Sequence, residues 1–166
     1  MQMPICSVCL GSDILCSGCG KKFQDGLITQ MDIDVSKYLF ELSEKITNLD
    51  TVKLNKIIDS DVLVMVAEPG DAPKLVGKNG AVVKALAKKF NKSIRVLESA
   101  GLEKFSRDLL SPTPIVGVNK VFKEDGEVLR VRAGASSKNK LLVSPESFSK
   151  IVQDIYGKRA ELVLEG

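Results

Sequence analysis

Four cysteines lie within the first twenty residues and form two C-x-x-C pairs: Cys6, Cys9, Cys16 and Cys19. A C-x-x-C turn lets two thiolates converge on one ion, and two such turns complete a tetrahedral sulfur shell. The pattern therefore predicts one structural Zn²⁺ held by all four cysteines, with no coordination position left open for catalysis. The spacing leaves two alternatives open, an iron or redox centre and a pair of disulfide bonds.

A second chemical motif is the loop Gly77-Lys78-Asn79-Gly80, which stands directly before an amphipathic helical pattern. Free backbone N–H groups at a helix N-terminus favour a phosphate. Seven basic residues and no acidic one occur between Lys74 and Arg95. A solvated lysine face or a plain helix–helix turn would explain either feature alone, but together they predict a phosphate-binding nucleic-acid site. Its expected members are Val76, Gly77, Lys78, Asn79, Gly80, Lys84, Lys88 and Arg95.

The chain of 166 residues contains no histidine. This excludes Ser-His-Asp and Cys-His nucleophilic catalysis, histidine-ligated metals and the usual proton shuttle at neutral pH. Aromatic residues make up only 5% of the chain, which argues against recognition of bases by stacking on a sheet. We therefore expect a binding protein and not an enzyme. The net charge of only +3 means that the distribution of charge, and not its sum, indicates nucleic-acid binding.

The elements that must position these residues follow from hydrophobic periodicity. Apolar residues at helical spacing predict a helix around 35–46, and two strand-like stretches at 51–58 and 61–67 are separated by a short turn. After the loop, one helix face carries Val83, Leu86, Ala87 and Phe90, and a strand follows at 93–97. The apolar residues available to contact bases are Val76, Val82, Val83, Ile94 and Val96, although most of them suit a core equally well and Val83 is expected there.

The rest of the chain repeats part of this order. The sequence predicts a helix at 102–110, strands at 114–122 and 128–132, a helix beginning after the N-cap Ser144, and a last strand at 159–164. We therefore expect a mixed α/β protein (α+β/α/β) with two similar units in tandem. The expected domains are a cysteine segment at 1–27, a first α/β unit at 28–99 and a second at 100–166.

From about residue 30 to its end, the chain resembles the tandem KH region of NusA-like transcription factors. The resemblance is carried by Leu75-Val76-Gly77-Lys78-Asn79-Gly80, by Ile94-Arg95-Val96-Leu97-Glu98 and by Leu109-Leu110-Ser111-Pro112. It implies two type II KH units, and the cysteine segment is similar to the zinc ribbon of archaeal NusA-like KH proteins. The implied function is a clamp on single-stranded RNA, or single-stranded DNA, in transcription elongation or termination with RNA polymerase. The alternative is an adaptor associated with the ribosome, a nuclease or RNA processing, which binds a protein through its zinc ribbon and second KH unit.

The second unit departs from the KH pattern where its own loop is expected, at Val143-Ser144-Pro145-Glu146. No glycine occurs there, Glu146 would repel a phosphate, and Pro145 has no N–H to donate. The second KH unit is therefore expected to be degenerate. It would serve packing, protein contact or a weaker basic surface made by Lys138, Lys140, Lys158 and Arg159.

The sequence also bears on location. The N-terminus lacks a charged leader followed by an apolar stretch, and the longest apolar run, at 62–67, is too short to cross a bilayer. We therefore expect a soluble, cytoplasmic protein with no membrane partner.

Overall fold

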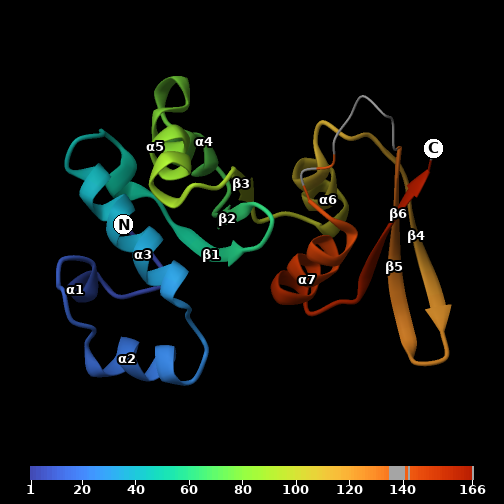
Figure 1. Ribbon diagram of the computed structural model, residues 1–166, viewed down its shortest axis with the longest axis horizontal. Coiled ribbons are helices and arrows are strands. Elements are labelled where there is room, and N and C mark those ends of the chain that lie inside the picture. The colour runs from blue at the N-terminus through green and yellow to red at the C-terminus, as the bar shows by residue number, and fades with distance from the viewer. Residues whose placement is uncertain (135–140, 142, 166) are drawn as a thin grey trace. The chain divides into compact units, whose positions relative to one another are not determined.

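A computed structural model describes residues 1–134, 141 and 143–165. It separates into two compact units. The first comprises Met1–Asp59 and Leu63–Ser99, and the second comprises Ser60–Val62 and the chain from Ala100 onward. Lys138 and Lys140, which the sequence places on a weaker basic surface, lie outside the described residues. Each unit contains one three-stranded sheet (Figure 1).

The cysteine segment is helical. It forms α1 (Ser7–Leu10) and α2 (Ser17–Gln24), and no strand of either sheet lies between residues 1 and 27. The expectation of a ribbon is therefore wrong in its secondary structure. The reason is that each C-x-x-C pair begins a helix, with Cys6 and Cys16 at the N-caps and Cys9 and Cys19 at the third helical positions.

The first unit continues with α3 (Gln30–Ser43), the 3₁₀ turn η1 (Leu49–Thr51), and the antiparallel strands β1 (Leu54–Asp59) and β2 (Leu63–Ala67). Helix α3 begins with a capping box, in which Thr29 and Asp32 satisfy each other's backbone N–H groups. Strand β3 (Ile94–Glu98) pairs in parallel with β2, so the strand order is β1-β2-β3. Strand β1 starts three residues later than expected because η1 occupies the chain up to Thr51.

Two helices with a short turn between them connect β2 to β3. Helix α4 (Ala72–Val76) is followed by the 3₁₀ turn η2 (Lys78–Gly80) and by α5 (Ala81–Phe90). The fully buried residues of α5 are Val82 and Leu86, whereas Val83 is only half-buried. The expectation that Val83 belongs to the buried face is therefore wrong by one position. Helix α5 starts directly after Gly80, and this start turns Val82 toward the interior.

One hydrophobic core joins the cysteine segment to the first sheet. Met3, Ile5, Cys9, Leu10 and Cys19 belong to the same buried cluster as Leu39 of α3, Leu63 and Met65 of β2 and Leu86 of α5. The backbone of Gln2 also bonds to the start of β1, since its N–H donates to Val52 O and its carbonyl accepts from Leu54 N. The cysteine segment is therefore part of the core and not a separate appendage.

The second unit repeats the order of the first. Helix α6 (Leu102–Leu110) precedes the antiparallel strands β4 (Ile115–Lys123) and β5 (Gly126–Gly134), and α7 (Pro145–Tyr156) precedes β6 (Ala160–Glu165). Strand β6 pairs in parallel with β5, which gives the order β4-β5-β6. The expected helix at 102–110 and the N-cap role of Ser144 are confirmed. Both sheets thus combine one antiparallel and one parallel pairing in the same sequence order.

Within the described residues, none of the helices is both long enough and apolar enough to span a bilayer.

Candidate metal centre and nucleic-acid interface

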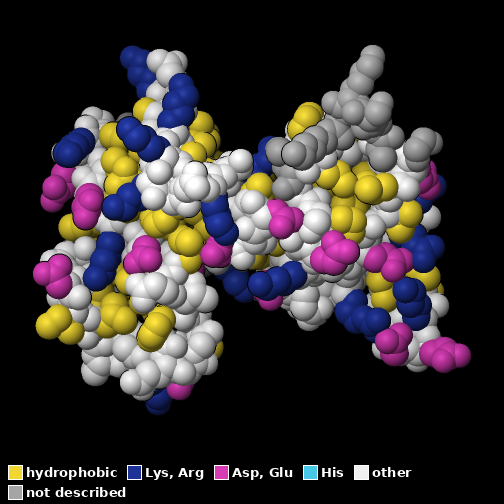
Figure 2. All heavy atoms as spheres, viewed as in Figure 1, with side chains coloured by type: hydrophobic (Ala, Val, Ile, Leu, Met, Phe, Trp, Pro, Cys, Tyr) yellow, Lys and Arg dark blue, Asp and Glu magenta, His cyan; other side chains and the backbone are white. Residues whose placement is uncertain are grey.

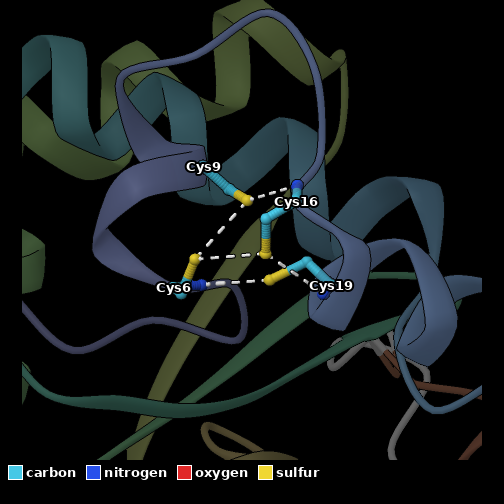
Figure 3. A group of neighbouring side chains, drawn as sticks. All are labelled: Cys6, Cys9, Cys16 and Cys19. Atoms are coloured by element: carbon cyan, nitrogen blue, oxygen red, sulfur yellow. Dashed lines mark hydrogen bonds between the residues drawn. The ribbon is translucent and has the colours of Figure 1, made fainter.

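The four cysteine sulfurs converge at one point of the first unit (Figure 3). All four Sγ atoms lie within 4.8 Å of one another. Cys6 Sγ is 3.5 Å from Cys9 Sγ and 3.7 Å from Cys16 Sγ. A tetrahedron of sulfurs around a metal with bonds of about 2.3 Å has edges of about 3.8 Å. The sulfur shell therefore fits one metal ion, and all four thiols are free, so the disulfide alternative is not the arrangement seen.

Backbone N–H groups point at the cysteine sulfurs, and three of these contacts are hydrogen bonds. Cys16 N donates to Cys9 Sγ at 3.1 Å, Cys6 N donates to Cys19 Sγ at 3.4 Å, and Cys19 N donates to Cys16 Sγ at 3.4 Å. Such bonds stabilise the charged thiolate form, which is the form that binds metal. The positions of the cysteines at helix N-termini place these donors, because the first N–H groups of a helix have no partner within it.

The thiols differ in their acidity. The backbone N–H of Cys9 lowers the pKa of the Cys6 thiol to about 6. The backbone N–H of Cys16 lowers the pKa of Cys9, but burial and the neighbouring thiol groups outweigh this effect and raise it to about 12. The pKa of Cys16 is lowered, chiefly by the backbone N–H of Cys19. Since like charges this close repel, a cation among the sulfurs would let all four ionise together.

The loop Gly77-Lys78-Asn79-Gly80 turns the chain between α4 and α5 with three left-handed residues. The φ angle is 79° at Gly77, 55° at Asn79 and 72° at Gly80. A Cβ atom on Gly77 would lie 2.7 Å from Val82 Cγ2 and 2.9 Å from Val82 N, so only glycine fits there. Asn79 tolerates this region better than other side chains. The turn therefore presents Lys78 and Asn79 to solvent.

The N-terminus of α5 begins at this turn without a cap. No side chain caps it, and no acidic residue occurs in its first turn. The helices α3 and α7, in contrast, are capped by Thr29 and Ser144. The partial positive charge at the start of α5 thus remains uncompensated beside the exposed loop, which is the electrostatic condition for binding an anion.

Three lysines extend this positive charge along α5. Lys78 lies in the loop, and Lys84 and Lys88 are one turn apart on the exposed face of α5. The Lys84 side chain lies against the loop, because a Cβ on Gly80 would be 3.8 Å from its Cε. Across the part of the chain that the structure describes, these three ammonium groups have no acidic partner. Figure 2 shows basic side chains gathered where α4 and α5 lie.

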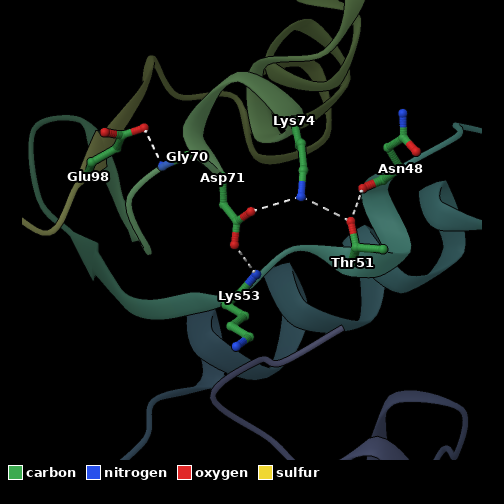
Figure 4. Close-up of polar contacts among 7 residues, drawn as sticks. All are labelled: Asn48, Thr51, Lys53, Gly70, Asp71, Lys74 and Glu98. Carbon is green, nitrogen blue, oxygen red and sulfur yellow. Dashed lines mark hydrogen bonds and ion pairs between the residues drawn. The ribbon is translucent and has the colours of Figure 1, made fainter.

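Other basic residues of the run are used within the fold. Lys74 Nζ donates to Asp71 Oδ1 at 3.0 Å and to Thr51 Oγ1 at 3.1 Å (Figure 4). Lys92 pairs with Asp59, and Lys89 Nζ lies 5.6 Å from the centre of the Tyr38 ring. The basic run is therefore mixed in role, and its solvent-directed part is the set Lys78, Lys84 and Lys88.

Sequence reasoning missed the role of Asp71. Besides the bond to Lys74, Asp71 Oδ2 accepts from Lys53 N at 2.9 Å, and the preceding loop residue, Gly70, donates its N–H to Glu98 Oε1 at 3.0 Å (Figure 4). The backbone N–H of Lys53 and the ammonium of Lys74 lower the pKa of Asp71. These contacts hold the start of α4, and so the loop that follows it. The sequence did contain a signal for this contact, because Asp71 and Lys74 are three residues apart, a spacing at which opposite charges can pair on one helix face.

The structure does not bring every expected nucleic-acid residue together. Val76 is 38% exposed beside the loop, but Ile94 and Val96 pack against the core of the first unit. Arg95 lies between them on β3 and therefore faces the other side of the sheet, in register with Val64. Val82 is fully buried. The loop, Lys84 and Lys88 thus form one surface, and Arg95 is not part of it.

The second unit has a different helix start at the place where its loop is expected. Ser144 Oγ accepts from Ser147 N at 3.2 Å, and Ser144 N donates to Asp61 Oδ2 at 2.9 Å. Pro145 occupies the first helical position, and Val143 is buried. This N-terminus is therefore already satisfied by the protein itself and lacks the open donors of α5.

Comparison with known proteins adds evidence about the fold alone. No protein-family profile matches the chain, and no curated protein matches it. Among solved structures 64 chains match. One of them is titled "Crystal structure of APE1850", with a TM-score of 0.58 and 18% sequence identity. The match covers 83% of this chain and 100% of that chain, so the same fold extends over most of both.

Proposed function

We propose that this protein binds single-stranded RNA through the loop Gly77–Gly80 of a KH-type first unit. The observation that carries the proposal is the uncapped N-terminus of α5 beside an exposed left-handed loop. Three lysines in the loop and along α5 have no acidic partner among the residues that the structure describes. Backbone N–H groups and ammonium groups are the donors that fix phosphate positions in nucleic acids. KH units clamp the backbone of four nucleotides with such a loop.

The arrangement of elements supports the KH assignment. The first unit runs α3-β1-β2-α4-loop-α5-β3, which is the order that the resemblance to NusA-like tandem KH proteins implies. The second unit repeats the same strand pairing without an open loop, so we propose that it is a degenerate KH unit. In this proposal the protein acts in transcription elongation or termination and has no catalytic role.

We also propose Zn²⁺ as the metal of the four-cysteine site. Four sulfurs at tetrahedral spacing leave no open position, and Cys9 and Cys19 are buried in the core. Iron would accept the same four thiolates, and metal analysis distinguishes the two. Zinc predicts one equivalent per chain and a colourless protein, whereas iron would give visible thiolate-to-metal charge-transfer absorption.

The RNA proposal is tested with the double variant Lys78→Asp/Asn79→Asp. Both side chains are exposed, and aspartate tolerates the left-handed backbone at position 79, so the fold should persist. Binding of a single-stranded RNA oligonucleotide should weaken at least about tenfold at moderate salt, because two carboxylates would face the phosphates. Unchanged affinity would refute the proposal.

The matched control is Lys45→Asp/Asn91→Asp. It changes the same residue types and the same net charge, and Asn91 also has a positive φ of 53°, at the far end of α5. Its RNA affinity should stay close to that of the unmodified protein. Parallel titrations with single-stranded DNA of the same base order measure how far the 2′-hydroxyl contributes.

A second candidate function is an adaptor role, and a specific observation favours it. The cysteine segment exposes four large apolar side chains, with exposed fractions of 72% for Val8, 78% for Ile14, 42% for Phe23 and 73% for Leu27. Exposed apolar groups that are clustered in one segment are typical of protein-contact surfaces. The partner in this proposal is RNA polymerase, a ribosome or a nuclease.

The adaptor role is tested with Ile14→Glu and Leu27→Glu against purified RNA polymerase and purified ribosomes. Each variant should weaken capture of the partner while leaving RNA affinity unchanged. Phe122→Glu, which alters an 80% exposed side chain of the second unit, separates the contribution of that unit. Equal capture by all the variants would count against the adaptor role.

A further inference from the structure

The second unit contains a hollow of about 370 Å³ that the proposed RNA clamp does not use. It is formed by the end of β4, the exposed side of α7 and the start of β6. The polar and charged residues that line it are Lys123, Ser149, Lys150, Gln153, Arg159 and Glu161. All except Glu161 are basic or neutral, so the lining is predominantly positive.

The one carboxylate of the lining is already shared by two cations. Glu161 Oε1 accepts from Arg130 Nε at 2.6 Å, and Glu161 Oε2 accepts from Lys123 Nζ at 3.1 Å. These two side chains lower the pKa of Glu161, Arg130 more than Lys123. One carboxylate neutralises only one of the two positive charges. A surplus positive charge therefore remains at this wall of the hollow.

The other cations of the hollow are held weakly or not at all. Arg159 Nη1 lies 3.0 Å from Asp125 Oδ2 and also donates to the backbone Asp125 O at 3.3 Å, but the Asp125 side chain is 68% exposed at the turn between β4 and β5. Pairs this exposed contribute little and exchange readily for another anion. Lys150 is exposed and meets no acidic side chain among the residues that the structure describes. The hollow is therefore lined by three cations, Lys123, Lys150 and Arg159, and by one carboxylate, Glu161.

Helix α7 adds a neutral donor to this charge. Gln153 lies one turn after Ser149 on the same face of α7, and its side-chain amide has no partner in the described chain. The Ser149 hydroxyl donates to Pro145 O at 3.0 Å, which leaves its oxygen as an acceptor. Lys150, Arg159 and Gln153 thus present unsatisfied or weakly held donors around one space, the arrangement that binds a phosphate oxygen by charge-assisted hydrogen bonds.

We propose that this hollow is a phosphate-binding site of the second unit. Its volume lies within the range of about 300–1,000 Å³ typical of small-ligand pockets, so a phosphate with an attached sugar would fit. The site does not coincide with the position of a KH loop, because that position is the N-terminus of α7 at Ser144, which the protein caps itself. The phosphate comes either from a nucleic-acid backbone or from a free phosphorylated small molecule.

The test maps ligands on the full-length protein by amide chemical shifts. Inorganic phosphate, adenosine monophosphate and a single-stranded RNA oligonucleotide are titrated separately. At least one of them should shift the amides of Lys150, Gln153 and Ala160. Shifts by phosphate and the mononucleotide but not by RNA identify a small-molecule site, and shifts by RNA identify a backbone contact. If none of the three probes moves these amides, the proposal is overturned.

The variant Lys150→Glu/Arg159→Gln should weaken the binding of whichever probe shifts these amides at least about tenfold. Both residues are exposed, so the fold should be kept. The charge-matched comparison is the single variant Lys150→Glu, which should lose binding, against Lys120→Glu, which lies on the same strand as Lys123 but on its opposite face and should bind normally. An equal loss of probe binding in the control would show that binding depends on the net charge of the protein alone, and it would refute the site.

The loop variant Lys78→Asp/Asn79→Asp separates this proposal from the RNA clamp. Phosphate and mononucleotide shifts at α7 should persist in it, because the hollow shares no residue with the loop. Loss of RNA binding with these shifts retained would support both proposals. If RNA binding is retained and none of the three probes shifts the amides of α7, the hollow is refuted as a site.

Discussion

Individual thiols in the metal centre have opposite tendencies to ionise. Cys6 is exposed and has a pKa of about 6, because the backbone N–H of Cys9 favours its thiolate. Cys9 is buried beside other sulfurs, which raises its pKa to about 12. The pKa of Cys19 is also raised, since burial and the neighbouring Cys6 thiol outweigh the lowering effect of the backbone N–H of Cys6. The metal-free site at neutral pH is thus partly ionised, with protons retained on the buried pair.

Metal binding should therefore release protons. At pH 7 the Cys6 thiol, with a pKa of about 6, is largely ionised. Cys9 and Cys19, whose pKa values are raised, must each lose a proton, so at least two protons leave per Zn²⁺ bound. The affinity should rise about tenfold per pH unit for each released proton, and fall further below about pH 6 as Cys6 is protonated. Calorimetric titration with Zn²⁺ in buffers of different ionisation enthalpy measures this number. A heat of binding that is independent of the buffer would contradict it.

At the scale of elements, the junction between α4 and α5 depends on two glycines for different reasons. Gly77 combines a positive φ with a close approach to Val82, whose buried side chain anchors α5. Gly80 also has a positive φ, of 72°, but the space beside it is open except for the Lys84 stem at 3.8 Å. The first glycine therefore sets the packing of the two helices, and the second sets only the backbone direction.

The variants Gly77→Ala and Gly80→Ala should separate these reasons. Gly80→Ala should cost about 1–2 kcal/mol of unfolding free energy, which is the usual strain of a left-handed alanine. Gly77→Ala should cost more, because the new methyl group meets backbone and side-chain atoms of Val82 below 3.0 Å and α5 must shift. Urea denaturation of both variants measures the difference. Equal costs would show that the contact with Val82 relaxes freely.

At the scale of the whole molecule, the cysteine segment and the first sheet share one core, while the second unit has its own sheet and buried residues such as Phe105, Phe148 and Ile151. A metal that fixes Cys9 and Cys19 therefore stabilises more than the short helices α1 and α2 in which these cysteines lie. The buried positions of Met3 and Ile5, which precede the first ligand, extend the effect toward β1.

Loss of the metal should destabilise the first unit as a whole. With free metal a thousandfold above its dissociation constant, binding contributes about 4 kcal/mol, which Cys9→Ser or a chelator would remove. Hydrogen exchange should then accelerate in α3, β1 and β2 and remain unchanged in β4, β5 and β6. Ser17→Ala, between the ligands but not one of them, should keep both metal and protection. Faster exchange confined to residues 1–27 would argue against the shared core.

Much of this fold could be predicted from the sequence because its signals are local. The helix at 102–110, the Ser144 cap and the two-unit repeat follow from periodicity and turn residues that act over a few positions. The cysteine spacing likewise predicted that four sulfurs meet, which is confirmed. Less could be predicted where the packing between elements decides whether a side chain faces the core, another side chain or solvent. Val82 and not Val83 faces the core, and Lys74 is held by Asp71 and Thr51 instead of facing solvent.

The sequence by itself determined which groups are available: four thiolates, a glycine-bounded loop, an acid-free basic run and no imidazole. The tertiary structure decided which of them act together. It placed Lys78 and Lys84 beside the uncapped start of α5, with Lys88 one turn further along the helix, and turned Arg95 to the other face of the sheet. The physical reason is that residue types fix chemistry and short-range backbone preference, whereas strand pairing and burial choose the face on which each side chain is placed.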